Sequence, residues 1–228
     1  MYFYYDSTFL ILIPGLLLTL YAQLRVSGTF NKYNKVESIK GQTAAQVCRQ
    51  LLDGIGLHEV RIQRVSGKLS DHYDPRNLTL SLSEATHDST SVAAIGVAAH
   101  EAGHAMQHRD NYAFLKARTT LVPVVNICSY VSIPLLILGS MLEVMGLVYA
   151  ALALYASIIV FQLVTLPVEL NASQRALSLL EGGNYLSGGE TAQAKKVLSA
   201  AALTYLAATL VAMLQFLRLA MLFGRRRN

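Results

Sequence analysis

Charged side chains are scarce in this sequence. Of its 228 residues, 14% are Asp, Glu, Lys or Arg and 53% are hydrophobic, whereas soluble globular domains carry about 25% charged residues. Much of the folded surface must therefore contact something other than water, and lipid is the expected environment. The length suits a single membrane-embedded domain that spans residues 1–228 and includes a polar insertion.

Features that would indicate secretion are also missing. The two cysteines, Cys48 and Cys128, cannot form a disulfide framework, so cysteine usage leaves the redox compartment open. No Lys or Arg precedes the first apolar run, at residues 7–24, and no small-x-small cleavage pattern follows it. A signal peptide is the competing interpretation of this run. We expect a membrane anchor that is retained.

Long apolar runs, in contrast, are abundant. Each is close to the roughly 20 residues that an α-helix needs to cross the hydrocarbon core of a bilayer. We predict membrane-spanning helices at residues 7–24, 119–142, 144–168 and 197–217. Only Glu143 separates the middle two, which indicates a helical hairpin with a very short turn. The expected fold is therefore a mainly α, multi-spanning membrane protein with four transmembrane helices.

The polar segment at residues 25–118 is predicted to hold a small α+β insertion. Alternating apolar and charged residues predict a strand at 59–65. The other elements expected here are a helix at 37–57, extended segments at 68–73 and 77–82, a polar loop at 83–91 and a buried helix at 92–108. Residues 169–196 should form a helix and a loop, and Ser187 with Glu190 fits a capping box that starts the last helix.

Basic residues are distributed unevenly between the two sides of the predicted spans. An excess of Lys and Arg near span ends marks the cytoplasmic side of a membrane protein. Arg225, Arg226 and Arg227 follow the last span, whereas the side of the polar segment carries Arg25, Lys32, Lys35, Lys40, Arg109, Lys116, Arg118, Arg175, Lys195 and Lys196. This distribution predicts a cytoplasmic polar segment. The formal net charge of +5 then indicates contact with anionic lipid rather than with nucleic acid.

The motif that carries chemistry is HExxH, at His100-Glu101-Ala102-Gly103-His104. Residues four apart on a helix differ by only about 40° in direction, so both imidazoles can reach one metal ion. Glu101 lies between them, close enough to take a proton from a metal-activated water. The alternative is a helix whose ionisable groups are satisfied by hydrogen bonds alone, which is costly in an apolar setting. We predict a zinc site with Glu101 as its catalytic base, so that the small α+β insertion is expected to be of the zincin-like metallopeptidase type.

A third ligand must come from another part of the chain. His108 lies two turns, about 12 Å, from His100 along a straight helix, and no glycine follows His104 to break that helix before His108. Glu169 ends the third apolar run, where a carboxylate at the membrane boundary needs a partner. We therefore predict that Glu169 is the third ligand and that His108 is not a ligand. A Glu169 carboxylate exposed to interfacial water is the alternative.

Two other functions fit parts of the sequence. Glu84 with His87, and Glu101 with His104, share the Glu-x-x-His spacing of carboxylate-bridged di-iron oxidases. Glu84 lies among Ser and Thr residues that indicate a loop, however, and His100 would have no role in such a site. A non-catalytic membrane scaffold would bind no metal. Metal analysis of the purified protein distinguishes zinc, iron and no metal.

Several blocks of this sequence resemble the YugP-like neutral zinc metallopeptidases of bacterial membranes. They are GKLSDHYDPR at 67–76, VAAHEAGHA at 97–105 with Gln107-His108, LPVE at 166–169 with Ala172-Ser173 and RAL at 175–177, and VL at 197–198 with AAALTY at 200–205. These blocks occur in order and cover most of the chain. The resemblance implies hydrolysis of peptide or protein substrates at a bacterial plasma membrane, with one zinc ion per chain.

More distantly, the chain resembles gluzincin membrane proteases of the prenyl-protease and heat-shock-protease type. In those, a later helix with Glu-x-x-Ala-Asp supplies the third ligand. Here Ser173 stands where that Asp would be, which puts in doubt the hydrogen bond that the Asp would make to a ligand. Because no histidine follows His108, a downstream histidine cannot stabilise the oxyanion. Candidates for oxyanion or substrate contacts are His72, Tyr73, Arg175 and Tyr205, and 68–73 is a candidate edge strand for pairing with substrate.

Overall fold

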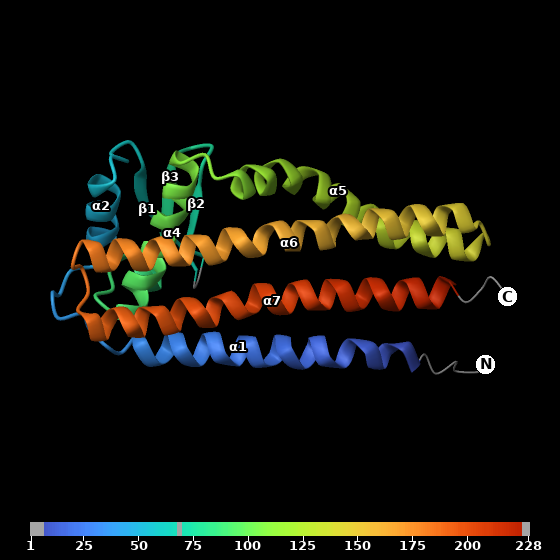
Figure 1. Cartoon of the computed structure of the whole chain (residues 1–228), viewed down its shortest axis with the longest axis horizontal. Coiled ribbons are helices and arrows are strands. Elements are labelled where there is room, and N and C mark those ends of the chain that lie inside the picture. Colours follow the sequence, from blue (N-terminus) through green and yellow to red (C-terminus); the bar gives the residue numbers. More distant parts are fainter. Residues whose placement is uncertain (1–6, 68–69, 225–228) are drawn as a thin grey trace.

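The computed structural model describes residues 7–67 and 70–224. Long helices lie side by side, and a smaller group of helices and strands packs at one end of them (Figure 1). Lys68 and Leu69, at the start of the predicted segment 68–73, and Arg225, Arg226 and Arg227, used above for orientation, lie outside the described residues.

Among the described residues, four helical segments are long and apolar enough to cross a membrane. They are the 3-10 helix η1 (Ser7–Leu12) continuing into α1 (Ile13–Tyr33), α5 (Ala113–Met141), α6 (Met145–Gly182) and α7 (Gly188–Gly224). Their most apolar stretches have mean hydropathies of 1.8 to 2.2. The prediction of a mainly α protein with four membrane-spanning helices is confirmed.

Every one of these helices is longer than the apolar run that predicted it. In α6, Ala172, Ala176 and Leu180 follow the predicted span at helical spacing, and all are fully buried. The helix therefore continues past the apolar run because its next turns pack into the polar segment. The same holds at the start of α7, where Ala194 and Leu198 are buried. The predicted loop within 169–196 shrinks to a short link between Gly182 and Gly188.

The four long helices form an open row rather than a closed bundle. Helix α7 packs against α1 on one side and α6 on the other, and α6 packs against α5 (Figure 1). Helices α5 and α6 are joined by a turn in which Glu143 adopts a left-handed conformation, with a φ of 57°. The short hairpin predicted around Glu143 is thus present, and it returns the chain to the level from which α5 departs.

The polar segment contains α2 (Ala44–Gly54), β1 (Arg61–Val65), β2 (His72–Asp74), β3 (Thr79–Ser83), α3 (Glu84–His87) and α4 (Val92–Arg109). The strand order is β1-β3-β2, with β1 parallel and β2 antiparallel to β3. The predicted small sheet is present, and β2 is one of its edges.

Two local predictions for the polar segment were wrong. The helix expected at 37–57 begins only at Ala44, because Thr43 caps it: its hydroxyl accepts a hydrogen bond from the backbone N–H of Gln46. The loop expected at 83–91 contains the one-turn helix α3. The capping box of Ser187 and Glu190 is formed as predicted and starts α7.

Helix α4 is the central element of the polar segment. Ser91 caps it by accepting a hydrogen bond from the N–H of Ala94, and its small side chains allow α2, α6 and α7 to pack closely around it. The closest approach is at Gly103. A Cβ atom there would lie 3.1 Å from the carbonyl carbon of Ala172 and closer still to the carbonyl oxygen. Only glycine lets α6 pass this near to the HExxH turn of α4.

Candidate active site

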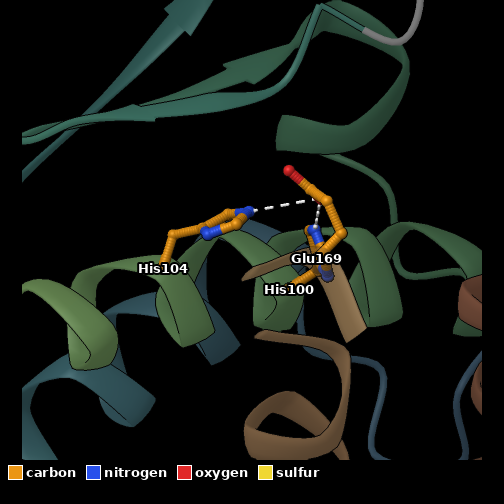
Figure 2. Close-up of side chains that lie close together, drawn as sticks. All are labelled: His100, His104 and Glu169. Atoms are coloured by element: carbon orange, nitrogen blue, oxygen red, sulfur yellow. Dashed lines mark hydrogen bonds and ion pairs between the residues drawn. The ribbon is translucent and has the colours of Figure 1, made fainter. Parts of the chain in front are cut away.

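Three side chains from two helices converge on one point. His100 and His104 lie on α4 and Glu169 lies on α6, and one ligand atom from each lies within 4.8 Å of the others (Figure 2). The Oε2 atom of Glu169 is 3.2 Å from Nε2 of His100 and 3.5 Å from Nε2 of His104. Because Glu169 is only 3% exposed, the alternative of a carboxylate in interfacial water does not describe its position.

The orientation of His104 is set by Gln107, one turn along α4. The side-chain amide N–H group of Gln107 donates to the carbonyl of Val168 at 2.8 Å and to Oδ1 of Asn171 at 3.0 Å. These two acceptors fix which end of the amide is nitrogen, so its oxygen lies 3.0 Å from Nδ1 of His104. Nδ1 therefore carries a proton and donates to Gln107, which directs Nε2 of His104 toward Glu169.

His100 has an equivalent partner in Ser173. The hydroxyl of Ser173 lies 3.1 Å from Nδ1 of His100, so this nitrogen is engaged while Nε2 faces Glu169. The sequence put this hydrogen bond in doubt because serine replaces aspartate here. The shorter side chain nevertheless reaches His100, since α6 passes so close to α4 at Gly103.

Arg118 is the site residue that sequence reasoning missed. Its guanidinium donates to Oε1 of Glu169 at 2.9 Å, so the two carboxylate oxygens are divided between Arg118 and the two imidazoles. Arg118 also lines the cavity in front of the cluster. In the sequence, Arg118 directly precedes the apolar run at 119–142. A basic residue at this place indicates the membrane orientation but not a contact with Glu169.

Two carboxylates act on the His104 imidazole. Burial lowers the pKa of this imidazole, but its hydrogen bond to Glu169 and the nearby Glu101 carboxylate outweigh burial, so the pKa lies above its usual value. The carboxylates that stabilise a protonated His104 would equally stabilise a metal cation bound to the neutral ring. Two neutral imidazole nitrogens and one carboxylate oxygen, with open space in front of them, are the donor set that zinc takes in hydrolytic sites, so the residues present fit this ion.

Glu101 lies at the junction of two cavities along α4. The central cavity, of about 380 Å³, contains His100, Glu101, His104 and Glu169. The Val97 cavity, of about 270 Å³, shares His100, Glu101 and Glu169 with it. Glu101 is 7% exposed, so its carboxylate reaches this space while most of the side chain is buried.

A third cavity extends the cleft in the opposite direction. The His108 cavity, of about 310 Å³, shares Leu115 and Thr119 of α5 with the central cavity. Because His108 and Val97 lie on either side of the motif in α4, the three cavities follow this helix past the cluster on both sides.

The four candidates for oxyanion or substrate contacts divide into two groups. His72, Tyr73 and Tyr205 all line the central cavity. Arg175 does not: it donates to Asn171 at 2.8 Å and to Asp110 at 2.5 Å. Since Asn171 also accepts from Gln107, Arg175 is linked to His104 only through two intervening side chains.

His108 lies outside the three-residue cluster. Its Nδ1 is 3.0 Å from the hydroxyl of Tyr73, in keeping with the helix remaining unbroken through Arg109. Burial, together with the carboxylates of Glu59 and Asp74, raises the pKa of Tyr73 to about 12, so this hydroxyl keeps its proton at neutral pH.

The second Glu-x-x-His pair is not brought to the cluster. Glu84 lies 4.0 Å from Arg64, and Nδ1 of His87 lies 2.6 Å from Asp88, both on the outer side of α3. Within residues 7–67 and 70–224, the group of side chains able to hold a metal ion is His100, His104 and Glu169.

Comparison with known proteins identifies the family of this chain. The sequence profile of the family described as "Putative neutral zinc metallopeptidase" matches residues 8–224. The chain is 44% identical over 219 residues to the "Putative membrane protease YugP" of Bacillus subtilis, an alignment that covers 95% of this chain and 97% of that protein. No solved structure matches the chain significantly. The resemblance predicted from the sequence is confirmed, and the chain belongs to this family of neutral zinc metallopeptidases.

Proposed function

We propose that this protein is a zinc-dependent membrane endopeptidase of the gluzincin type, with one zinc ion per chain held by His100, His104 and Glu169. The observation that carries the proposal is the convergence of these three donors beside Glu101 in an open cleft. Zinc bound there would supply a Lewis acid that polarises the scissile carbonyl and lowers the pKa of a water molecule, so that the water can lose a proton and attack that carbonyl.

Glu101 is the proposed general base. It takes the proton from the attacking water and passes it to the leaving amine, a transfer that a positioned carboxylate performs when it lies within hydrogen-bond reach. Its position one residue after His100 puts it on the open side of the cluster, next to both cavities. Tyr205, which lines the same two cavities from α7, is the proposed donor to the developing oxyanion, because its side chain interacts with Glu169 of the cluster, whereas the hydroxyl of Tyr73 bonds to His108.

An internal peptide bond, rather than a chain end, is the proposed target. The cleft continues beyond the cluster in both directions, as the His108 and Val97 cavities, so a chain can extend on both sides of the reacting bond. His72, Tyr73 and Asp74 of the edge strand β2 line the central cavity. An extended peptide can add to this edge through main-chain hydrogen bonds.

The active site is proposed to lie at the cytoplasmic boundary of the membrane. The basic residues around the polar segment, including Arg109, Lys116 and Arg175, support this orientation. The bilayer and a peptide or protein substrate are then the partners that the site requires.

Replacing Glu101 with glutamine is the direct test of the mechanism. We expect Glu101→Gln to retain near-stoichiometric zinc, since all three donors remain, but to lose peptidase activity by at least about 100-fold, the lower range for a general acid–base group. Metal content is measured by atomic emission and activity by peptide cleavage. Turnover close to that of the unmodified protein would rule out Glu101 as the base. Iron, or no metal, in the unmodified protein would favour the oxidase or the scaffold.

Gln107 offers a test of how His104 is held. We expect Gln107→Leu to weaken zinc binding by about 10- to 100-fold, the usual effect of removing the partner of a ligating imidazole. Gln107→Glu should restore only part of the affinity, because its carboxylate still accepts the proton of Nδ1 but cannot donate to Val168 and Asn171. Equal affinities for the two variants would mean that Gln107 acts through packing alone.

The neighbouring His108 provides the matched control. We expect His108→Ala to keep near-stoichiometric zinc, because this imidazole bonds to Tyr73 and lies outside the cluster. Zinc loss as large as that caused by His104→Ala would show instead that His108 is a ligand.

A further inference from the structure

The mechanism proposed above uses the Val97 cavity only as room for the substrate chain and assigns no substrate group to it. The cavity lies next to His100 and Glu101, and four helices, α1, α4, α6 and α7, contribute to its walls. Its apolar lining comes from α1, α4 and α7, and consists of Val26, Val97, Val197, Leu198, Ala201 and Ala202.

Apart from the proposed catalytic and metal-binding residues, the polar groups that reach this cavity are already engaged within the protein. Asp71 accepts hydrogen bonds from the N–H and the hydroxyl of Ser83, at 2.8 and 3.1 Å. Ser173 bonds to His100, and the hydroxyl of Thr204 donates to a backbone carbonyl of its own helix at 2.7 Å. A polar ligand would therefore find few free partners beyond the metal centre itself, whereas an apolar group would lose nothing by entering.

The size of the cavity also suits an apolar side chain. Apolar cavities of about 150 Å³ bind benzene, and this one measures about 270 Å³. On α7, the small side chains of Ala201 and Ala202 leave space between the larger residues of the same wall.

We propose that the Val97 cavity is the subsite for a large apolar side chain, aliphatic or aromatic, on the substrate residue adjoining the scissile bond. This proposal rests on the proposed function, because the cavity is adjacent to the reacting bond only if His100 and Glu101 belong to the catalytic centre. The first membrane helix then takes part in substrate selection, since Val26 of α1 closes one side of the subsite.

Binding to the inactive Glu101→Gln variant tests the proposal without turnover. Two zinc-binding peptide hydroxamates are compared by calorimetry on the zinc-loaded, detergent-purified protein, one with a leucine side chain next to the hydroxamate and one with glycine. We expect the leucine compound to bind roughly 10- to 100-fold more tightly, the effect of burying that side chain fully. Equal affinities would overturn the subsite and leave the zinc site intact. A protein that holds no zinc would overturn the proposed function and the subsite together.

Filling the cavity is the second arm. Ala202→Leu should remove most of the preference for the leucine compound and leave the affinity for the glycine compound within about twofold. In digests of denatured casein, it should shift cleavage from Leu, Met and Phe toward Ala and Gly at one position beside the cut. Ala208→Leu, the same change on α7 away from the three cavities, is the matched control.

Two outcomes of the second arm count against the proposal. Unchanged selectivity in Ala202→Leu would show that substrate side chains do not enter the cavity. A change in lipid-dependent thermal stability, without any change in selectivity, would assign the cavity to a lipid acyl chain instead.

Discussion

Zinc content should fall from near-stoichiometric to a small fraction when Glu169 is replaced with alanine. The two imidazoles alone leave the coordination incomplete, so the affinity should drop by more than the roughly 10- to 100-fold that follows the loss of a ligand's hydrogen-bond partner. Glu169→Asp keeps a carboxylate, one methylene further away, and should bind zinc far more tightly than Glu169→Ala. Zinc is measured by atomic emission after dialysis against a weak chelator, with activity in parallel.

Zinc retention by Glu169→Ala would mean that another residue supplies the third ligand. If Glu169→Ala retained full zinc and activity, Glu84, Asp71 and Asp74 would have to be tested. Asp71 and Asp74 line the central cavity, whereas Glu84 pairs with Arg64 on the outer side of α3.

Gly103→Ala should also reduce the zinc content, although it changes none of the three metal-binding side chains. The added Cβ would meet the backbone carbonyl of Ala172, which cannot rotate away as a flexible side chain could. Helix α6 must therefore shift from α4, at a cost of about 1–3 kcal/mol for overpacking, and Glu169 moves with it. We expect a lower melting temperature and weakened zinc binding together.

A glycine on the same helix as Ala172 supplies the control. Gly182 ends α6, and a Cβ added there meets nothing within 4 Å. Gly182→Ala should therefore leave both stability and zinc affinity close to those of the unmodified protein. Full zinc binding by Gly103→Ala would mean that the two helices can separate without disturbing the site.

The sequence predicted the structure best where the residues of the HExxH motif also follow helical spacing. The helix predicted at 92–108 matches α4 almost residue for residue, because its small residues and its cap act locally. Glu169 was found because a carboxylate at the end of an apolar run is conspicuous. Glu169 lies beside His100 because the hairpin around Glu143 returns the chain to α4. This hairpin could be predicted because a single charged residue separates two apolar runs.

What could not be predicted were contacts between side chains on different helices. Arg118 and Gln107 have ordinary local surroundings, and their roles follow only from α5 and α6 passing close to α4. The lengths of the long helices were underestimated for a related reason. The length of an apolar run predicts only the part of a helix that contacts lipid. The extensions of α6 and α7 are stabilised instead by packing against the polar segment.

The hairpin of α5 and α6 separates the proposed ligands along the chain. His100 and His104 precede it, and Glu169 reaches them only after both membrane crossings have been completed. Since the free energy of zinc binding is available only to a chain with its ligands assembled, a newly made copy that has not entered the bilayer presents two imidazoles and cannot hold the ion tightly. Membrane insertion would then control the proposed peptidase activity. The protein would be inactive during synthesis and would become active when both crossings are complete.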